Sequence, residues 1–147
     1  HPLLAGLGPE PLENTFSANY LRQKLQGRRQ SVKVLIMDNH IVVGVGNIYA
    51  NEALFMAGIH PERSGTSLTL AECRLLVRQI KAILARAIRQ GGTTLRDFVG
   101  GDGKPGYFAQ QLMVYGREGQ SCKRCDSALG SVRLGQRATV FCPRCQT

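Results

Sequence analysis

The chain has 147 residues, enough for one or two small domains with hydrophobic cores. Its 43% hydrophobic content is that of a folded protein, and no apolar run approaches the length of a membrane span. Lysine and arginine outnumber aspartate and glutamate by 19 to 10, so the formal net charge is +9. This charge predicts a polyanion as partner, although a basic domain without such a partner is the alternative.

Proline and glycine mark the beginning of the chain. The first 14 residues hold three prolines and two glycines, which is typical of an extended lead-in or linker, and a chain that opens this way is expected to be a fragment of something longer. We assign 1–14 to this lead-in, 15–116 to a helical domain and 117–147 to a small terminal module.

Apolar spacing predicts three helices in the first half of the chain. The first covers 15–27 and the second covers 30–39, with Ser31 as a possible cap. A third begins at Asn47 and reaches Met56, directly after a glycine-containing turn. Glycine pairs are common in turns, but a helix that starts at such a turn presents backbone N–H groups that suit an anion.

The clearest predicted helix covers 69–90. It opens on Thr69-Leu70-Ala71-Glu72, the pattern of a capping box, and apolar residues then recur along one face from Leu70 to Ile88. Cys73 lies on that face, which favours a core residue over a reactive thiol. Four basic residues lie mostly off the face, which favours a solvated surface over a DNA-binding one. These are Arg74, Arg78, Lys81 and Arg89.

The segment after this helix is predicted to be irregular. Residues 98–107 are glycine-rich and form a loop, and residues 108–116 lead into the last module as a short helix or strand. The β-prone stretch 138–141 predicts a hairpin in that module.

Four of the five cysteines form two Cys-x-x-Cys pairs separated by 16 residues. Each pair places two sulfurs on a tight turn, so that two pairs together can make a tetrahedral thiolate site. Such a site selects zinc or iron, and with four protein ligands the metal is structural. Two disulfides are the alternative, but the odd cysteine count favours a reducing interior. The predicted zinc ligands are Cys122, Cys125, Cys142 and Cys145.

The terminal module is small and basic. About 30 residues bury too little apolar surface to fold without the metal. Between 117 and 147, six positive residues face two negative ones, Glu118 and Asp126, which indicates contacts to phosphates. The positive residues are Arg117, Lys123, Arg124, Arg133, Arg137 and Arg144.

Several long motifs, in the same order, resemble one family of proteins. The stretches 37–55, 90–98 and 103–108, together with the four cysteines, resemble the bacterial formamidopyrimidine-DNA glycosylases. This resemblance implies a mainly α fold, a helix–two-turns–helix bundle followed by a small β-hairpin zinc finger with four cysteine ligands. It also implies DNA base-excision repair of 8-oxoguanine and ring-opened purines, by a hydrolase that is also an abasic-site (AP) lyase.

The family's catalytic residues have no counterpart here. In the family, an N-terminal proline amine attacks the sugar and the next residue is a general-acid glutamate. In this chain Pro2 follows His1 and precedes Leu3, and the nitrogen of Pro9, before Glu10, is an internal amide. We therefore expect the chain to be the C-terminal half of such an enzyme, with no catalytic residue and no activity of its own.

The resemblance also implies which residues contact DNA. Asn47 and Arg137 would grip phosphates beside the lesion, and Lys33 and Tyr115 would add backbone contacts. Arg137 is the most favoured of these, since its planar guanidinium suits a phosphate, with a solvated hairpin arginine as the alternative. The expected partner is double-stranded DNA with oxidised purines or abasic sites, bound by a monomer.

Residues 93–98 resemble the family's lesion-recognition segment. The backbone carbonyl of Thr93 would accept the N7 hydrogen that distinguishes 8-oxoguanine from guanine, and Lys104 would help to cap the flipped base. The amides that would face O6 belong to Leu95, Arg96, Asp97 and Phe98.

Two other interpretations remain open. The chain could be a stand-alone zinc module that binds nucleic acid without chemistry, or an enzyme that uses another nucleophile. The second is weak because Lys33 and Lys104, the only plausible amines, have no adjacent acid. Glu52 is interpreted as structural, orienting the turn or pairing with a nearby base. The absence of a membrane span or signal sequence predicts a bacterial cytoplasmic, nucleoid-associated protein.

Overall fold

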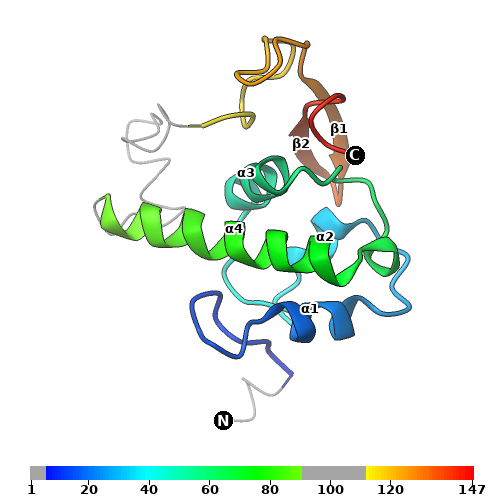
Figure 1. Cartoon of the computed structure of the whole chain (residues 1–147), viewed down its shortest axis with the longest axis vertical. Coiled ribbons are helices and arrows are strands. Elements are labelled where there is room, and N and C mark those ends of the chain that lie inside the picture. Colours follow the sequence, from blue (N-terminus) through cyan, green and yellow to red (C-terminus); the bar gives the residue numbers. More distant parts are fainter. Residues whose placement is uncertain (1–5, 91–111) are drawn as a thin grey trace.

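The computed structural model describes residues 6–90 and 112–147. Helices form the larger part, and an antiparallel hairpin carries the cysteine cluster, as Figure 1 shows. The predicted fold class is therefore confirmed. The elements are α1 (Ala18–Leu25), α2 (Val32–Ile36), α3 (Asn47–Ala57), the 3-10 turn η2 (Gly65–Ser67), α4 (Leu70–Arg89), β1 (Gly130–Leu134) and β2 (Arg137–Phe141).

The first two helices are shorter than predicted because their caps lie inside the predicted ranges. Helix α1 begins after Ser17, whose hydroxyl accepts a hydrogen bond from the N–H of Tyr20, and it ends where Gln26 leaves the helical conformation. Ser31 caps α2 as expected, accepting from the N–H of Val34.

The described elements are stacked in layers. Helix α4 packs against α1 on one side and against α3 on the other, and α3 in turn packs against β2 (Figure 1). Because α3 lies between two layers, nearly all of its residues are buried, including the polar Asn47, Asn51 and Glu52. Buried polar groups need hydrogen-bond partners, so these three side chains indicate where α3 binds its neighbours.

Helix α4 has the predicted capping box. The hydroxyl of Thr69 accepts from the N–H of Glu72 at 3.1 Å, and the Glu72 carboxylate accepts from the N–H of Thr69 at 2.9 Å. Cys73 is fully buried, as predicted, and burial raises the pKa of its thiol to about 11. Ile88 was expected on the buried face, but it is 54% exposed because it lies in the last turn, at the rim of a shallow apolar hollow shared with Leu12.

The described part of the lead-in lies against the helices. The N–H of Gly8 donates to the carbonyl of Asn39 at 2.9 Å. The Lys81 ammonium donates to the carbonyls of Pro11 at 2.9 Å and Glu13 at 2.7 Å. Lys81 therefore ties this segment to α4, so it is not simply part of a solvated face.

A two-residue turn closes the hairpin. Leu134 and Arg137 form the last pair, and both turn residues, Gly135 and Gln136, have positive φ. This is the backbone form that matches the twist of a tight hairpin. It places Arg137 at the start of β2, next to the hairpin tip.

Residues 112–116 form bends and turns, not the predicted short helix or strand. The reason is that the backbone N–H groups here bind a side chain of α3, as described below. The predicted loop 98–107 lies outside the described residues. Within the two described ranges, no helix is both long and apolar enough to cross a membrane.

Candidate zinc centre and nucleic-acid interface

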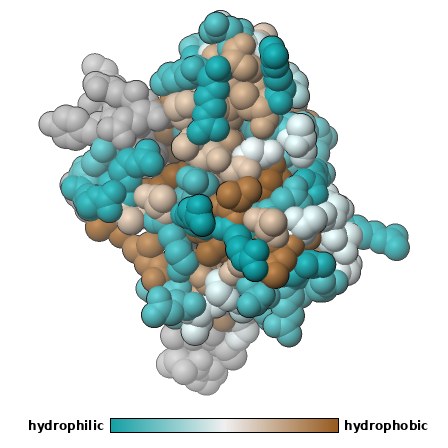
Figure 2. Space-filling view, viewed as in Figure 1, coloured by the Kyte–Doolittle hydropathy of each residue, from teal (hydrophilic) through white to brown (hydrophobic). Residues whose placement is uncertain are grey.

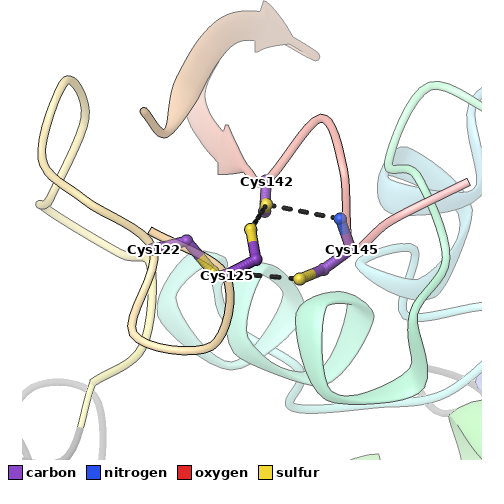
Figure 3. Close-up of side chains that lie close together, drawn as sticks. All are labelled: Cys122, Cys125, Cys142 and Cys145. Carbon is purple, nitrogen blue, oxygen red and sulfur yellow. Dashed lines mark hydrogen bonds between the residues drawn. The ribbon is translucent and has the colours of Figure 1, made fainter. Parts of the chain in front are cut away.

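The four predicted cysteine ligands meet at one point. Their sulfurs all lie within 4.8 Å of one another, and Figure 3 shows the side chains converging from two turns of the chain. Two of the separations, Cys122 to Cys145 and Cys125 to Cys142, are 3.9 and 3.4 Å. Zinc–sulfur bonds of about 2.3 Å in a tetrahedron put the sulfurs ~3.8 Å apart, so the cluster fits one zinc ion.

Hydrogen bonds and burial act on the cysteine sulfurs in opposite directions. Arg124 donates its N–H to the sulfur of Cys122 at 3.4 Å, and Cys145 donates to that of Cys142 at 3.3 Å. Hydrogen bonds from Ser127 lower the pKa of Cys125 to about 6. Burial and hydrogen bonding with the other three sulfurs raise the pKa of Cys145 to about 12. Four thiolates at this spacing therefore need a cation between them.

The core of the finger contains a residue from the helical domain. Phe55 of α3 is fully buried in the cluster formed by the finger's apolar side chains, together with Val114 and Val140. The guanidinium of Arg124 stacks over its ring at 4.8 Å and also contacts the sulfur of Met56 at 3.3 Å. The finger is thus packed onto α3.

Hydrogen bonds join β2 to the beginning of α3. The Oδ1 atom of Asn51 accepts from the N–H of Val140 at 2.6 Å, and its Nδ2 atom donates to the carbonyl of Asn47 at 2.8 Å. The Nδ2 atom of Asn47 donates to the carbonyl of Ala138 at 3.0 Å. These bonds hold Arg137, the residue before Ala138, close to the N-terminus of α3.

The N-terminus of α3 has the features of an anion-binding site. Gly44 has φ +82°, which lets the chain turn sharply into the helix. The N-cap residue, Gly46, provides no side-chain cap. The Oδ1 atom of Asn47 is buried and has no hydrogen-bond partner among the described residues. The positive end of the helix dipole is therefore not neutralised by a capping side chain.

Lys33 lies beside this site. Its side chain is fully buried, and its ammonium has no hydrogen-bond partner in the described part of the chain. Burial, and then repulsion by Arg137, lower the pKa of Lys33 to about 8. Arg137 also lines an open hollow with Asp38, between α2 and the hairpin tip. An anion bound near both side chains would reduce this repulsion.

Glu52 binds the segment that contains Tyr115. Its buried carboxylate accepts backbone hydrogen bonds from Met113 at 2.7 Å and from Val114 and Tyr115 at 2.9 Å each. A structural role agrees with the sequence interpretation, but the partner is this segment, not the glycine turn or a basic side chain. Glu52 thereby fixes the position of the half-buried Tyr115 relative to α3.

Most of the finger's positive side chains bind protein atoms. Arg117 and Lys123 donate to carbonyls of Met113 and Leu112, and Arg133 donates to that of Gln136. The side chain of Arg137 has no hydrogen bond or ion pair in the described residues and is exposed, which leaves its guanidinium free for a ligand. The predicted lesion-recognition residues lie outside the described residues: Thr93, Leu95, Arg96, Asp97, Phe98 and Lys104.

Sequence reasoning missed two residues that shape this interface, Asn51 and Phe55. Asn51 lies four residues after Asn47, a spacing that puts both amides on the same face of α3 and could have indicated a shared partner. Phe55 gave no such signal, because an apolar residue in a buried helix is equally consistent with the helical core.

Comparison with known proteins identifies this arrangement. Residues 7–99 match the family described as formamidopyrimidine-DNA glycosylase H2TH domain. The chain belongs to this family. Residues 119–147 match the zinc finger found in FPG and IleRS, which agrees with a single zinc ion at the four cysteines.

Relatives of this glycosylase family cover almost the whole chain. The formamidopyrimidine-DNA glycosylase of Shewanella loihica is 60% identical over 146 residues, which are 99% of this chain and 54% of that protein. The crystal structure of MutM (Fpg) from Thermus thermophilus is 43% identical with a TM-score of 0.85, covering 99% of this chain and 55% of that one. Lactococcus lactis Fpg in complex with DNA containing an abasic site is 34% identical, with a TM-score of 0.85 over 99% of this chain and 52% of that one. The chain thus spans about half the length of the relatives it matches.

Proposed function

We propose that these 147 residues are the DNA-binding part of a bacterial formamidopyrimidine-DNA glycosylase and AP lyase. The whole enzyme would remove 8-oxoguanine and ring-opened purines from duplex DNA. The observation that carries the proposal is the bond from Asn47 to the Ala138 carbonyl, which joins the α3 N-terminus to the strand that begins at Arg137. We propose further that the enzyme works as a monomer in the bacterial cytoplasm, on the nucleoid.

The proposed interface grips phosphates beside the lesion. A glycosylase must rotate its target out of the stack at a cost of a few kcal/mol, so the flanking backbone has to be held. Arg137 would bind one phosphate through its planar fork, and the N-terminus of α3 at Asn47 would bind another. A phosphate next to Lys33 would relieve the repulsion between this ammonium and Arg137.

Contacts to the nucleotide itself would come from two further segments. Tyr115, positioned by Glu52, would touch the DNA backbone. The flipped base would be read by the carbonyl of Thr93 and the amides of 95–98, with Lys104 as a cap. For these last residues, the support is their resemblance to the family motif.

The chain is proposed to bind without catalysing. In the whole glycosylase, an N-terminal proline amine would attack the sugar, and the chain's own Pro9 nitrogen is an internal amide. Borohydride trapping on abasic DNA tests this, because any imine formed with an amine would be reduced to a stable crosslink. A crosslink to this chain would show that Lys33 or another amine is a nucleophile.

Binding measurements separate the proposed function from a stand-alone zinc module. Fluorescence anisotropy would compare one duplex with an abasic analogue and one intact duplex across a salt series. A lesion-gripping part binds the abasic duplex more tightly, and Arg137→Ala removes the preference. A module that ignores damage would bind both duplexes equally, with the same steep salt dependence.

A further inference from the structure

A second group of basic residues lies on the outer layers of the molecule. Arg74 and Arg78 are exposed on α4, one turn apart and therefore on the same side of the helix. Arg22 is half-buried on α1, which packs against α4, and its charge acts on Cys73 in the first turn of α4. We call these three arginines, Arg22, Arg74 and Arg78, the α1–α4 basic face.

The charges of this face are uncompensated in the described part of the chain. None of the three guanidinium groups takes part in an ion pair or hydrogen bond there. The nearest acid on α4, Glu72, is occupied by Arg63 and by its own capping box. Arg63 and Arg124, by contrast, are held by protein atoms, the first in an ion pair and the second over an aromatic ring.

The face lies on other elements than the interface at Arg137. Arg137 lies at the hairpin tip against α2, whereas the basic face lies on α1 and α4, which pack against each other (Figure 1). Figure 2 shows hydrophilic side chains over the front of α4, interspersed with hydrophobic ones. One exposed apolar residue of α4 is Leu75, which follows Arg74 in the sequence.

We propose that the α1–α4 basic face binds the phosphate backbone of a second DNA segment while the first is held at Arg137. The proposal rests on the proposed function only in taking DNA as the partner. Guanidinium groups bind phosphates strongly, and each neutralised phosphate releases about 0.9 counterions on duplex DNA. A protein with two such faces bridges two segments and can pass from one to the other without release into solution.

The test uses the zinc-loaded chain and two duplexes that carry different fluorophores. A short abasic-analogue duplex is saturated first, and the second, intact duplex is then titrated while energy transfer between the two is measured. The unaltered chain is expected to give transfer that falls with salt. The variant Arg22→Gln/Arg74→Gln/Arg78→Gln is expected to weaken binding of the second duplex at least tenfold and that of the first less than twofold.

Two controls make the result specific. Replacement of the same three arginines by lysine keeps the charge, so bridging should persist, and a matching melting temperature excludes unfolding. Arg137→Gln should weaken the binding of the first duplex, whereas the basic face should still bind intact DNA. The inference is overturned if the glutamine variant bridges like the unaltered chain. It is also overturned if the variant's affinity for the first duplex falls as much as its affinity for the second. If the unaltered chain bridged two duplexes but showed no preference for the abasic one, that result would count against the proposed function and not against DNA binding by this face.

Discussion

Asn51 and Val140 lie 89 positions apart in the chain and are joined by a 2.6 Å hydrogen bond from the Val140 N–H to the Asn51 side chain. Asn51 is 1% exposed, so water cannot replace the bond. The same side chain donates to the carbonyl of Asn47 at the start of α3. One amide therefore fixes the hairpin against the helix end that is proposed to bind phosphate.

Replacing Asn51 by alanine should separate these two elements. The change leaves the Val140 N–H buried without a partner, which costs about 1–3 kcal/mol. Urea denaturation of the zinc-loaded chain measures the free energy of unfolding, and binding of abasic DNA should weaken in parallel. The exposed Asn19→Ala variant is the control and should match the unaltered chain. Equal stability of the Asn51 and Asn19 variants would contradict the assigned role.

Glu52→Gln tests the anchor of residues 113–115. Three backbone N–H groups now donate to the two carboxylate oxygens of Glu52. Glutamine has only one acceptor oxygen, and its NH2 group would face a backbone N–H donor. We expect a loss of about 2–3 kcal/mol, since these bonds are made to a charged group. Thermal melting would measure it. Glu62→Gln, at an exposed carboxylate, should change the melting temperature little, and an equal loss in both variants would refute the anchor.

Zinc removal should unfold the finger and spare the helices. Chelation leaves four crowded thiols that repel as they ionise, whereas the helical layers keep a separate core. Circular dichroism should retain most of the helical signal while DNA binding is lost, because Arg137 is no longer held beside α3. Cys125→Ser should abolish the single bound zinc, and Cys73→Ala should keep it. Retention of zinc by Cys125→Ser would place the metal elsewhere.

Lys33 should make stability depend on pH. Its pKa is lowered from 10.5 to about 8 in the folded chain, so between these values the unfolded chain binds a proton that the folded chain lacks. Stability contributed by this group therefore rises with pH in that window, and below about 8 the penalty for the buried charge is complete. Urea midpoints of Lys33→Met should be higher near neutrality and rise less with pH. The exposed Lys24→Met is the control.

The same lysine should couple DNA binding to protonation. A phosphate beside Lys33 would stabilise its charged form and raise its pKa, so binding takes up a proton in solutions near pH 8. The affinity for abasic DNA should fall as the pH rises through this value, and calorimetry in two buffers of different ionisation enthalpy would count the protons. Lys33→Met should abolish the uptake. Unchanged uptake in that variant would assign it to another group.

Local patterns could be predicted from the sequence because covalent geometry settles them. The spacing of Cys122 from Cys125 brings two sulfurs onto one turn whatever surrounds them. Thr69 and Glu72 are three residues apart, which is the distance a capping box needs. The helix starting at Asn47 follows in the same way from glycines and apolar spacing, and the hairpin follows from the β-prone stretch 138–141.

Other features depended on partners far away in the chain. Ile88 continues the apolar spacing of its helix, but exposure depends on what packs against the last turn. Phe55 enters the core of the finger because α3 lies between two layers. The buried ammonium of Lys33 senses the charge of Arg137 because the hairpin tip lies against α2. The sequence by itself determined the zinc ligands, the helices and the family resemblance. Only the tertiary structure decided which side chains are buried together, because burial depends on contacts between residues that are far apart in the sequence and follow no local spacing rule.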